Sequence, residues 1–210
     1  MYIITAILGG VLTGLGAWLT MRKLPPPPEK KKYVLPFLAA TAVLGAIGGG
    51  VIPLRTDLWS TWVRLLFVLT VLAVTAYTDF RSCRIPNVCV AVLLIGFPVC
   101  TALDWIAVRQ VSFGLLMGGI VAFVTAFLFL ILFRKLSHGG IGYGDIKLVS
   151  ALAALIGLYG TVFIMFAGEL TALIFAGLMI LIKKLTTKDR VPFAPFCYLG
   201  YIITLILGTF

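Results

Sequence analysis

The chain has 210 residues, of which 61% are hydrophobic and 11% charged, and its mean hydropathy is +1.15. This apolar share exceeds that of soluble domains, which excludes a fold with one water-excluded core. The net charge of +10 comes from short basic clusters at the ends of apolar runs, not from a basic face that carries aromatic residues. We therefore expect the lipid bilayer as a partner and no nucleic acid.

Windows of about 20 apolar residues predict eight membrane-spanning helices. The sixth is short, and its boundary with the seventh depends only on Leu158, Tyr159 and Gly160, so seven helices remain an alternative. The first apolar run lacks the flanks of a cleavable signal and is predicted to be retained. The expected fold is an all-α polytopic membrane helical bundle with residues 1–210 as one membrane-embedded domain, and its spans are 3–21, 34–52, 60–78, 87–103, 111–133, 146–160, 161–182 and 193–210.

Basic residues predict the orientation of the bundle. All but three of the 17 Lys and Arg residues lie in or next to the connections after the first, third, fifth and seventh helices, and the exceptions are Arg55, Arg64 and Arg109. The positive-inside rule places those connections in the cytosol and both termini outside it. One of them is a short cytosolic link rich in Pro and Lys, residues 22–33, whose four prolines favour an extended backbone.

Cysteine and histidine usage predicts no metal site and no cofactor. No two of the four cysteines are spaced as CxxC, and the only histidine, His138, has no potential metal ligand near it in sequence. We interpret His138 as an exposed interfacial residue. The cysteines are interpreted as small packing residues, and they are Cys83, Cys89, Cys100 and Cys197.

The seven acidic residues differ in their surroundings. Solvated loop charge is a sufficient interpretation for four of them, and no role is assigned to Glu169, which would face a polar crevice or lie near the outer surface. Asp79 ends the third predicted helix, which runs inward, and Asp145 opens the sixth, which runs outward. Both are therefore expected at the cytosolic boundary of the membrane. The four loop residues are Glu29, Asp57, Asp104 and Asp189.

Two carboxylates at one depth suit peptide hydrolysis. Like charges at close range raise one pKa, so that the pair shares a proton. The ionised member can then take a proton from water while the neutral member hydrogen-bonds the scissile carbonyl. Helix ends predict Asp145 as the base, at a positive helix start, and Asp79 as the acid, at a negative helix end. The alternative for Asp145 is a simple N-cap.

Glycines surround Asp145 in the segment GGIGYGDIKLVS, residues 139–150. Gly142 and Gly144 flank Tyr143 and allow a substrate backbone to come close to the carboxylate. We therefore expect the loop before the sixth helix to be part of the site.

Three segments together resemble the type IV prepilin peptidases, membrane aspartic proteases of the GxGD kind. The first is DFRSCRIPN from residue 79, the second is GIGYGDIKL, and the third is VPFAPFCYLGY, residues 191–201. The resemblance implies an enzyme of the bacterial cytoplasmic membrane that removes the basic leader from prepilins or pseudopilins at the cytosolic face. It implies Asp79 and Asp145 as the catalytic pair. The implied supporting or substrate-binding residues are Ile85, Pro86, Asn87, Gly142, Gly144, Lys147, Pro192, Phe193 and Pro195.

The supporting residues also have structural interpretations. Pro86 favours an extended Ile85, and Asn87 can cap the fourth helix, so that this element is a corner beside Asp79. The segment 191–196 can hold an extended peptide or simply start the last helix. Lys147 is a loop charge or a residue that tunes the acid pair.

The chain departs from many members of the resembled family in the connection after the first helix. That connection carries no pair of CxxC motifs for zinc, which predicts a short form with weak or no N-methyltransferase activity. Two other functions remain open. One is a GxGD protease acting on other transmembrane substrates, and the other is a proton or cation transporter that uses the buried acids.

Overall fold

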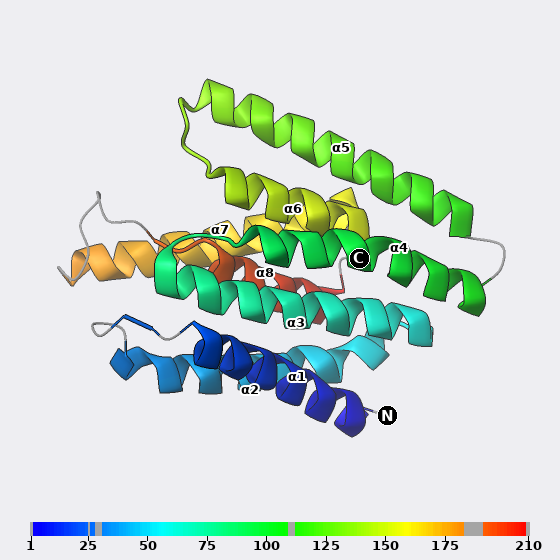
Figure 1. The fold of residues 1–210 in the computed structure, drawn as a ribbon, viewed down its shortest axis with the longest axis horizontal. Helices are drawn as coiled ribbons and strands as arrows, with labels where there is room; N and C mark the ends of the chain where they lie inside the picture. Colours follow the sequence, from blue (N-terminus) through cyan, green and yellow to red (C-terminus); the bar gives the residue numbers. More distant parts are fainter. Residues whose placement is uncertain (1, 25, 28–30, 109–111, 183–190, 209–210) are drawn as a thin grey trace.

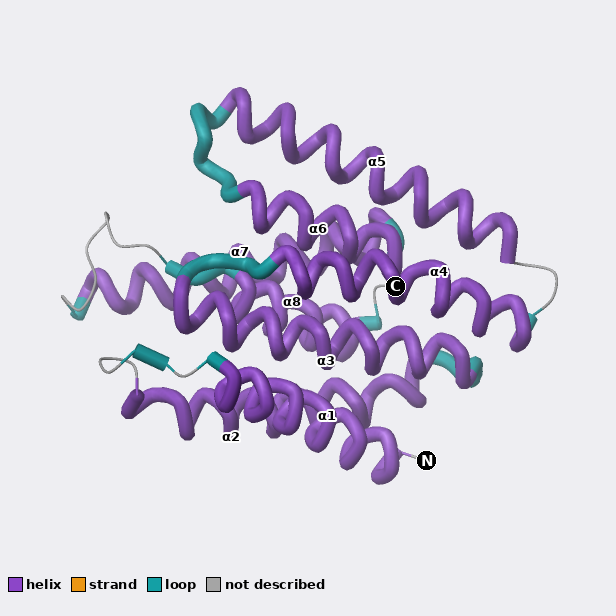
Figure 2. The backbone as a smooth tube through the Cα atoms, in the orientation of Figure 1, coloured by secondary structure: helices purple, strands orange, loops and turns teal. Residues whose placement is uncertain are grey.

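The computed structural model describes residues 2–24, 26–27, 31–108, 112–182 and 191–208. Within these ranges the chain forms eight α-helices and no strand, packed as a bundle (Figures 1 and 2). The prediction of an all-α polytopic membrane bundle is confirmed. The helices are α1 (Tyr2–Lys23), α2 (Lys31–Arg55), α3 (Trp59–Ser82), α4 (Asn87–Ala107), α5 (Ser112–Leu136), α6 (Tyr143–Ile156), α7 (Leu158–Leu181) and α8 (Ala194–Leu207).

Two helices are shorter than the rest. Six helices are long and apolar enough to cross a membrane, whereas α6 and α8 have 14 residues each. The break between α6 and α7 lies at Gly157, whose φ of 87° and ψ of 164° belong to a region that only glycine adopts readily. The seven-helix alternative is therefore wrong, because the chain reverses at this glycine.

The first two helices form a closely packed hairpin. A side chain at Gly9 or Gly49 would overlap the backbone of the facing helix. The hydroxyl of Thr13 on α1 donates a hydrogen bond to the carbonyl of Thr41 on α2, 3.2 Å away. Small residues that let helix backbones approach, with a polar bond across them, are typical of helix pairs in lipid.

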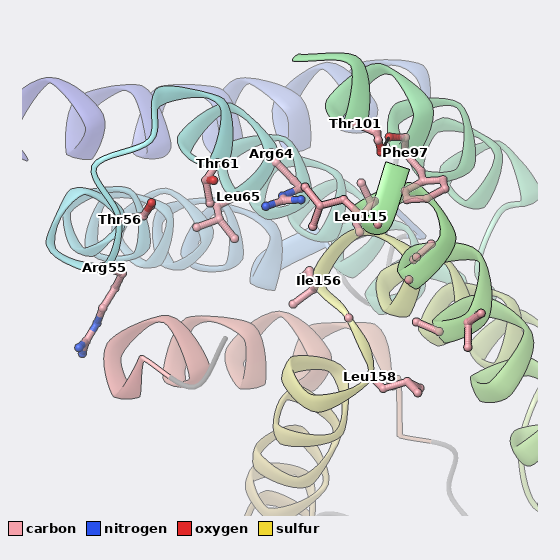
Figure 3. A pocket seen from close by; sticks show the side chains of 18 residues that line it. Arg55, Thr56, Thr61, Arg64, Leu65, Phe97, Thr101, Leu115, Ile156 and Leu158 are labelled. Atoms are coloured by element: carbon pink, nitrogen blue, oxygen red, sulfur yellow. Dashed lines mark hydrogen bonds between the residues drawn. The ribbon is translucent and has the colours of Figure 1, made fainter. Parts of the chain in front are cut away.

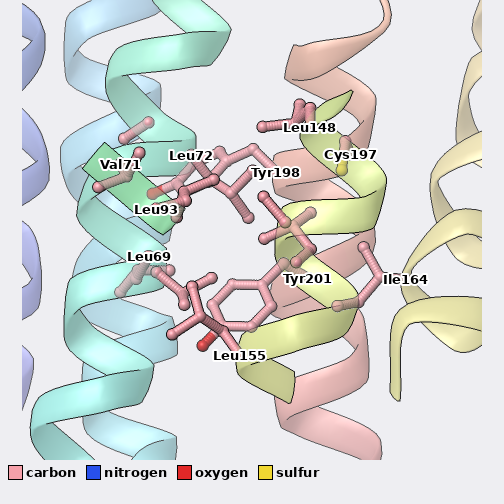
Figure 4. Close-up of a cluster of buried hydrophobic side chains, with 14 of the residues drawn as sticks. Leu69, Val71, Leu72, Leu93, Leu148, Leu155, Ile164, Cys197, Tyr198 and Tyr201 are labelled. Carbon is pink, nitrogen blue, oxygen red and sulfur yellow. The ribbon is translucent and has the colours of Figure 1, made fainter. Parts of the chain in front are cut away.

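The core lies between α3, α4, α6 and α8 (Figure 4). Large apolar side chains such as Leu69, Leu72 and Leu148 are fully buried there. Two buried tyrosines of α8 have their hydroxyls bonded across the bundle, Tyr198 to the carbonyl of Thr41 and Tyr201 to that of Leu65, each at 2.9 Å. A buried hydroxyl needs such a partner, so these bonds fix the rotation of α8.

The C-terminal ends of α1, α3, α5 and α7 and the N-terminal ends of α2, α4, α6 and α8 lie at one end of the bundle (Figure 1). We call this end the loop-rich end. It is the arrangement that the alternating spans predicted. The helices continue further into the first connection than expected, since α1 ends at Lys23 and α2 begins at Lys31. Residues 25 and 28–30 of the predicted link lie outside the described residues.

The opposite end contains an ion pair that the sequence analysis did not predict. Asp104 lies in the last turn of α4, is 5% exposed, and receives a hydrogen bond of 3.0 Å from Arg64 of α3. The interpretation of Asp104 as a solvated loop charge is therefore wrong, because α4 continues past the predicted end of its span and buries the carboxylate. Asp57 is exposed, as expected.

Candidate active site

Asp79 lies in the last turn of α3 at the loop-rich end and is 4% exposed. Its Oδ2 accepts a hydrogen bond of 2.8 Å from the backbone N–H of Ala194, the first residue of α8. The carboxylate therefore sits at the positive end of a second helix. Only the negative end of α3 is apparent from the sequence, because the packing of α8 against α3 is not visible in one stretch of sequence.

Asp145 is the third residue of α6, and it is half-buried. The cap of this helix is Gly142, so the interpretation of Asp145 as the N-cap is wrong. Its carboxylate instead turns back and accepts a hydrogen bond from the backbone N–H of Gly142, as an acidic third residue does in a capping box. A Cβ at Gly142 would lie 2.7 Å from Oδ2 of Asp145, so the glycine makes room for the carboxylate.

The IPN and GxGDxK segments contact each other beside Asp145. A Cβ at Gly144 would lie 3.2 Å from the Cβ of Ile85, so the first turn of α6 packs directly on the α3–α4 connection. Lys147 Nζ donates a hydrogen bond of 3.3 Å to Oδ1 of Asn87. Asn87 is the first residue of α4, and Pro86 is its N-cap residue, so the expectation that Asn87 caps the helix is wrong.

The third segment reaches the site through the start of α8. Phe193 is the N-cap residue of α8, and Pro195 lies in its first turn, where a missing N–H costs no helical bond. Pro192 is half-buried in the irregular backbone before them. The structure thus brings together the three segments that the sequence singled out, and Ala194 supplies the direct contact to Asp79.

Asp145 lines a cavity of about 210 Å³ between α5, α6, α7 and the segment before α8. Asp79 is not among its lining residues. Glu169 of α7, to which no role was assigned from the sequence, does line the cavity. The sequence contains a sign that Glu169 lies near Asp145, because the two residues are equally far from Gly157 along the chain, one before and one after it. The cavity is lined by Leu130, Gly140, Ile141, Asp145, Val149, Met165, Glu169, Val191 and Phe193.

The electrostatics of Asp145 oppose the expectation from helix ends. Asp145 precedes the predicted span 146–160 and lies outside the six long apolar helices. Burial, followed by the charge on Asp79, raises the pKa of Asp145 to about 6, while the bond from Gly142 lowers it. Burial and a like charge thus outweigh the helix start, and the pKa of Asp145 lies above the ordinary range of an aspartate.

Arg134 of α5 was not predicted to belong to the site. Its guanidinium donates a hydrogen bond to the carbonyl of Ile141 and lies 4.0 Å from the ring centre of Tyr143. Arg134 therefore contacts the residues on both sides of Gly142, Ile141 and Tyr143. His138, in the same connection, is exposed, as expected.

A further cavity, of about 410 Å³, opens at the opposite end between α3, α4, α5 and α6 (Figure 3). Its lining includes Arg64 and a row of α5 glycines, and it contains neither aspartate of the predicted pair. Its two arginines are already bonded, Arg64 to Asp104 and Arg55 to the carbonyl of Leu205 at 3.1 Å. We therefore assign the candidate chemistry to the loop-rich end.

A polytopic helical membrane protein with two interacting aspartates at one end defines a class of candidate membrane hydrolases. Comparison with known proteins agrees, since residues 66–177 match the model of the type IV leader peptidase family. The match covers more than half of the chain, which therefore belongs to this family. It includes both aspartates and Glu169.

One curated relative is the prepilin leader peptidase/N-methyltransferase of Bacillus subtilis (strain 168). It is 27% identical over 140 residues, which are 67% of this chain and 54% of the relative. The chain thus spans about half the length of the relative that it matches. No solved structure was found to match it.

Proposed function

We propose that the protein is an aspartic endopeptidase that removes the leader peptide from type IV prepilins or pseudopilins. Membership of the leader peptidase family supports the substrate class. The positive-inside pattern supports a site at the cytosolic face of the bacterial cytoplasmic membrane, because nearly all the Lys and Arg residues belong in sequence to the connections after α1, α3, α5 and α7.

One observation carries the proposal: three segments far apart in sequence meet around two interacting carboxyl groups. Ala194 binds Asp79, Gly144 packs on Ile85, and the charge on Asp79 acts on Asp145. If the aspartates were a loop charge and a helix N-cap, neither would need a second acid nearby. A transporter would not need three proline- or glycine-containing segments to converge on the pair. An acid pair that shares a proton needs both groups held in this way.

We assign the roles in the order opposite to the one expected from helix ends. Asp79 is the base, because the N-terminus of α8 favours its ionised form. Asp145 is the acid, because burial and Asp79 raise its pKa. Asp79 takes a proton from water as the water oxygen attacks the scissile carbonyl carbon, and protonated Asp145 hydrogen-bonds the carbonyl oxygen. The C–N bond then breaks, and the amine leaves with a proton from the pair.

Asp79 must be uncovered for this step, since it is 4% exposed and bonded to α8. We propose that an extended substrate segment binds beside Phe193 and admits water to the carboxylate while the N–H of Ala194 stays bonded to it. The apolar wall of the cavity beside Phe193 offers the surface for such a segment.

The test is cleavage of a prepilin by the purified protein and by the variants Asp79→Asn and Asp145→Asn. Each variant is expected to lose at least about 100-fold in rate, because positioned acid and base groups contribute that much or more. The control Asp57→Asn changes an exposed acid at the other end and should cleave normally. Full activity in either site variant would contradict the acid pair. The product mass also reports methylation, which we expect to be weak or absent.

A further inference from the structure

Glu169 is the one described acid that the proposed mechanism leaves unused although it lies at the site. It is in the middle of α7, a helix whose neighbouring side chains Phe166 and Leu173 are 67% and 70% exposed and face the lipid. A carboxylate at such a position is costly unless it faces water or a partner. Glu169 is exposed, and the cavity that it lines together with Asp145 gives it access to water.

The short α6 explains why Glu169 reaches this depth. The chain reverses at Gly157, so antiparallel packing of α6 and α7 places equally distant residues level with each other. Asp145 and Glu169 are such a pair. Because α7 is longer than α6, it continues beyond the site and extends past the neighbouring end of α3 (Figure 1).

The charged groups that act on Asp145 are mainly negative. The charges of Asp79 on α3 and Glu169 on α7 both act on Asp145, and each raises its pKa. Two nearby cations have other partners, since Arg134 of α5 binds the carbonyl of Ile141 and Lys147 of α6 binds Asn87 of α4. From α8, the buried Cys197 lies within electrostatic reach of both Asp145 and Glu169. No basic residue lines the cavity in the described part of the chain.

We propose that Glu169 is a positioning residue that keeps the catalytic proton on Asp145. Its negative charge on the far wall of the cavity opposes ionisation of Asp145, so that Asp79 is the member of the pair that ionises. Glu169 acts through Asp145 and does not itself touch the scissile bond. The inference rests on the proposed function and adds a third carboxyl group to the electrostatics of the pair.

The test is the pH dependence of kcat/KM for cleavage of a prepilin by the full-length protein in detergent. Cleavage needs protonated Asp145, so kcat/KM should fall as the pH rises through about 6, the pKa of that group in the free enzyme. Removing the charge in Glu169→Gln lowers this pKa and moves the alkaline limb to lower pH, by roughly half a pH unit for a charge across a small hydrated cavity. Glu169→Asp keeps the charge and should retain most of the original profile.

The outcomes separate the inference from the function on which it rests. A uniform loss of rate in Glu169→Gln with an unmoved alkaline limb, or a limb moved to higher pH, overturns the role of Glu169. If that occurs while Asp79→Asn and Asp145→Asn are inactive, the peptidase function stands. If those two variants cleave normally, the function itself has failed.

Discussion

At the scale of single residues, the site depends on the absence of a side chain at Gly142. Its backbone angles, φ −70° and ψ 144°, suit any residue, so no backbone strain demands a glycine. The demand comes from Asp145, whose Oδ2 lies only 2.7 Å from the position of a Cβ on residue 142. The same glycine supplies the N–H that holds this carboxylate. One residue thus sets both the position and the hydrogen bonding of the proposed acid.

Replacing Gly142 by Ala should therefore impair catalysis without unfolding the protein. The new methyl group pushes the Asp145 carboxylate aside, and a displacement of about 1 Å at a reacting group costs on the order of 100-fold in rate. Cleavage kinetics and thermal unfolding in detergent check this. The control is Gly118→Ala on α5, where a Cβ meets nothing within 4 Å. Equal kcat in Gly142→Ala and the wild type would show that the carboxylate position is unimportant.

At the scale of helices, Gly157 sets the register between α6 and α7. The sequence predicted both helices and their order, since apolar runs and intervening glycines are local signals. It placed their boundary at 158–160 and began the sixth helix at 146, whereas the structure begins α6 at Tyr143. This error hid the level pairing of Asp145 with Glu169. Contacts such as Ala194 with Asp79 were not predictable, because they depend on how distant helices pack.

Replacing Gly157 by Ala should strain this reversal. A Cβ there meets no atom within 4 Å, so the cost comes only from the backbone angles. That cost is about 1–3 kcal/mol for a non-glycine residue in this region. The matched control is Gly177→Ala in α7, which also has open space around it but lies within a helix, where Ala is favoured over Gly. Thermal unfolding should show a loss for Gly157→Ala alone, and similar behaviour of the two variants would refute the strain.

At the scale of the whole molecule, the two ends of the bundle hold their charged groups differently. The loop-rich end brings two acids together, each bonded to a backbone N–H, which suits proton transfer. The opposite end pairs Asp104 with Arg64 between α3 and α4. Charge counting along the sequence predicted the orientation of the bundle, because basic residues segregate by loop. It did not distinguish a solvated Asp104 from a paired one, since burial depends on where α4 ends.

The Arg64–Asp104 pair should therefore contribute to stability and not to cleavage. Asp104→Asn leaves Arg64, whose side chain is 21% exposed, without its counter-charge. Breaking a buried pair in this way costs 3–5 kcal/mol, and partial exposure of Arg64 reduces this to about 2 kcal/mol. The unfolding temperature should drop, whereas kcat per folded enzyme should not change, because the pair lies at the end of the bundle away from Asp79 and Asp145. An Asp104→Asn variant that unfolds at the normal temperature but cleaves slowly would instead show that the ion pair affects catalysis at the other end. If the lost counter-charge is the cause of the instability, the double variant Arg64→Met/Asp104→Leu should recover stability.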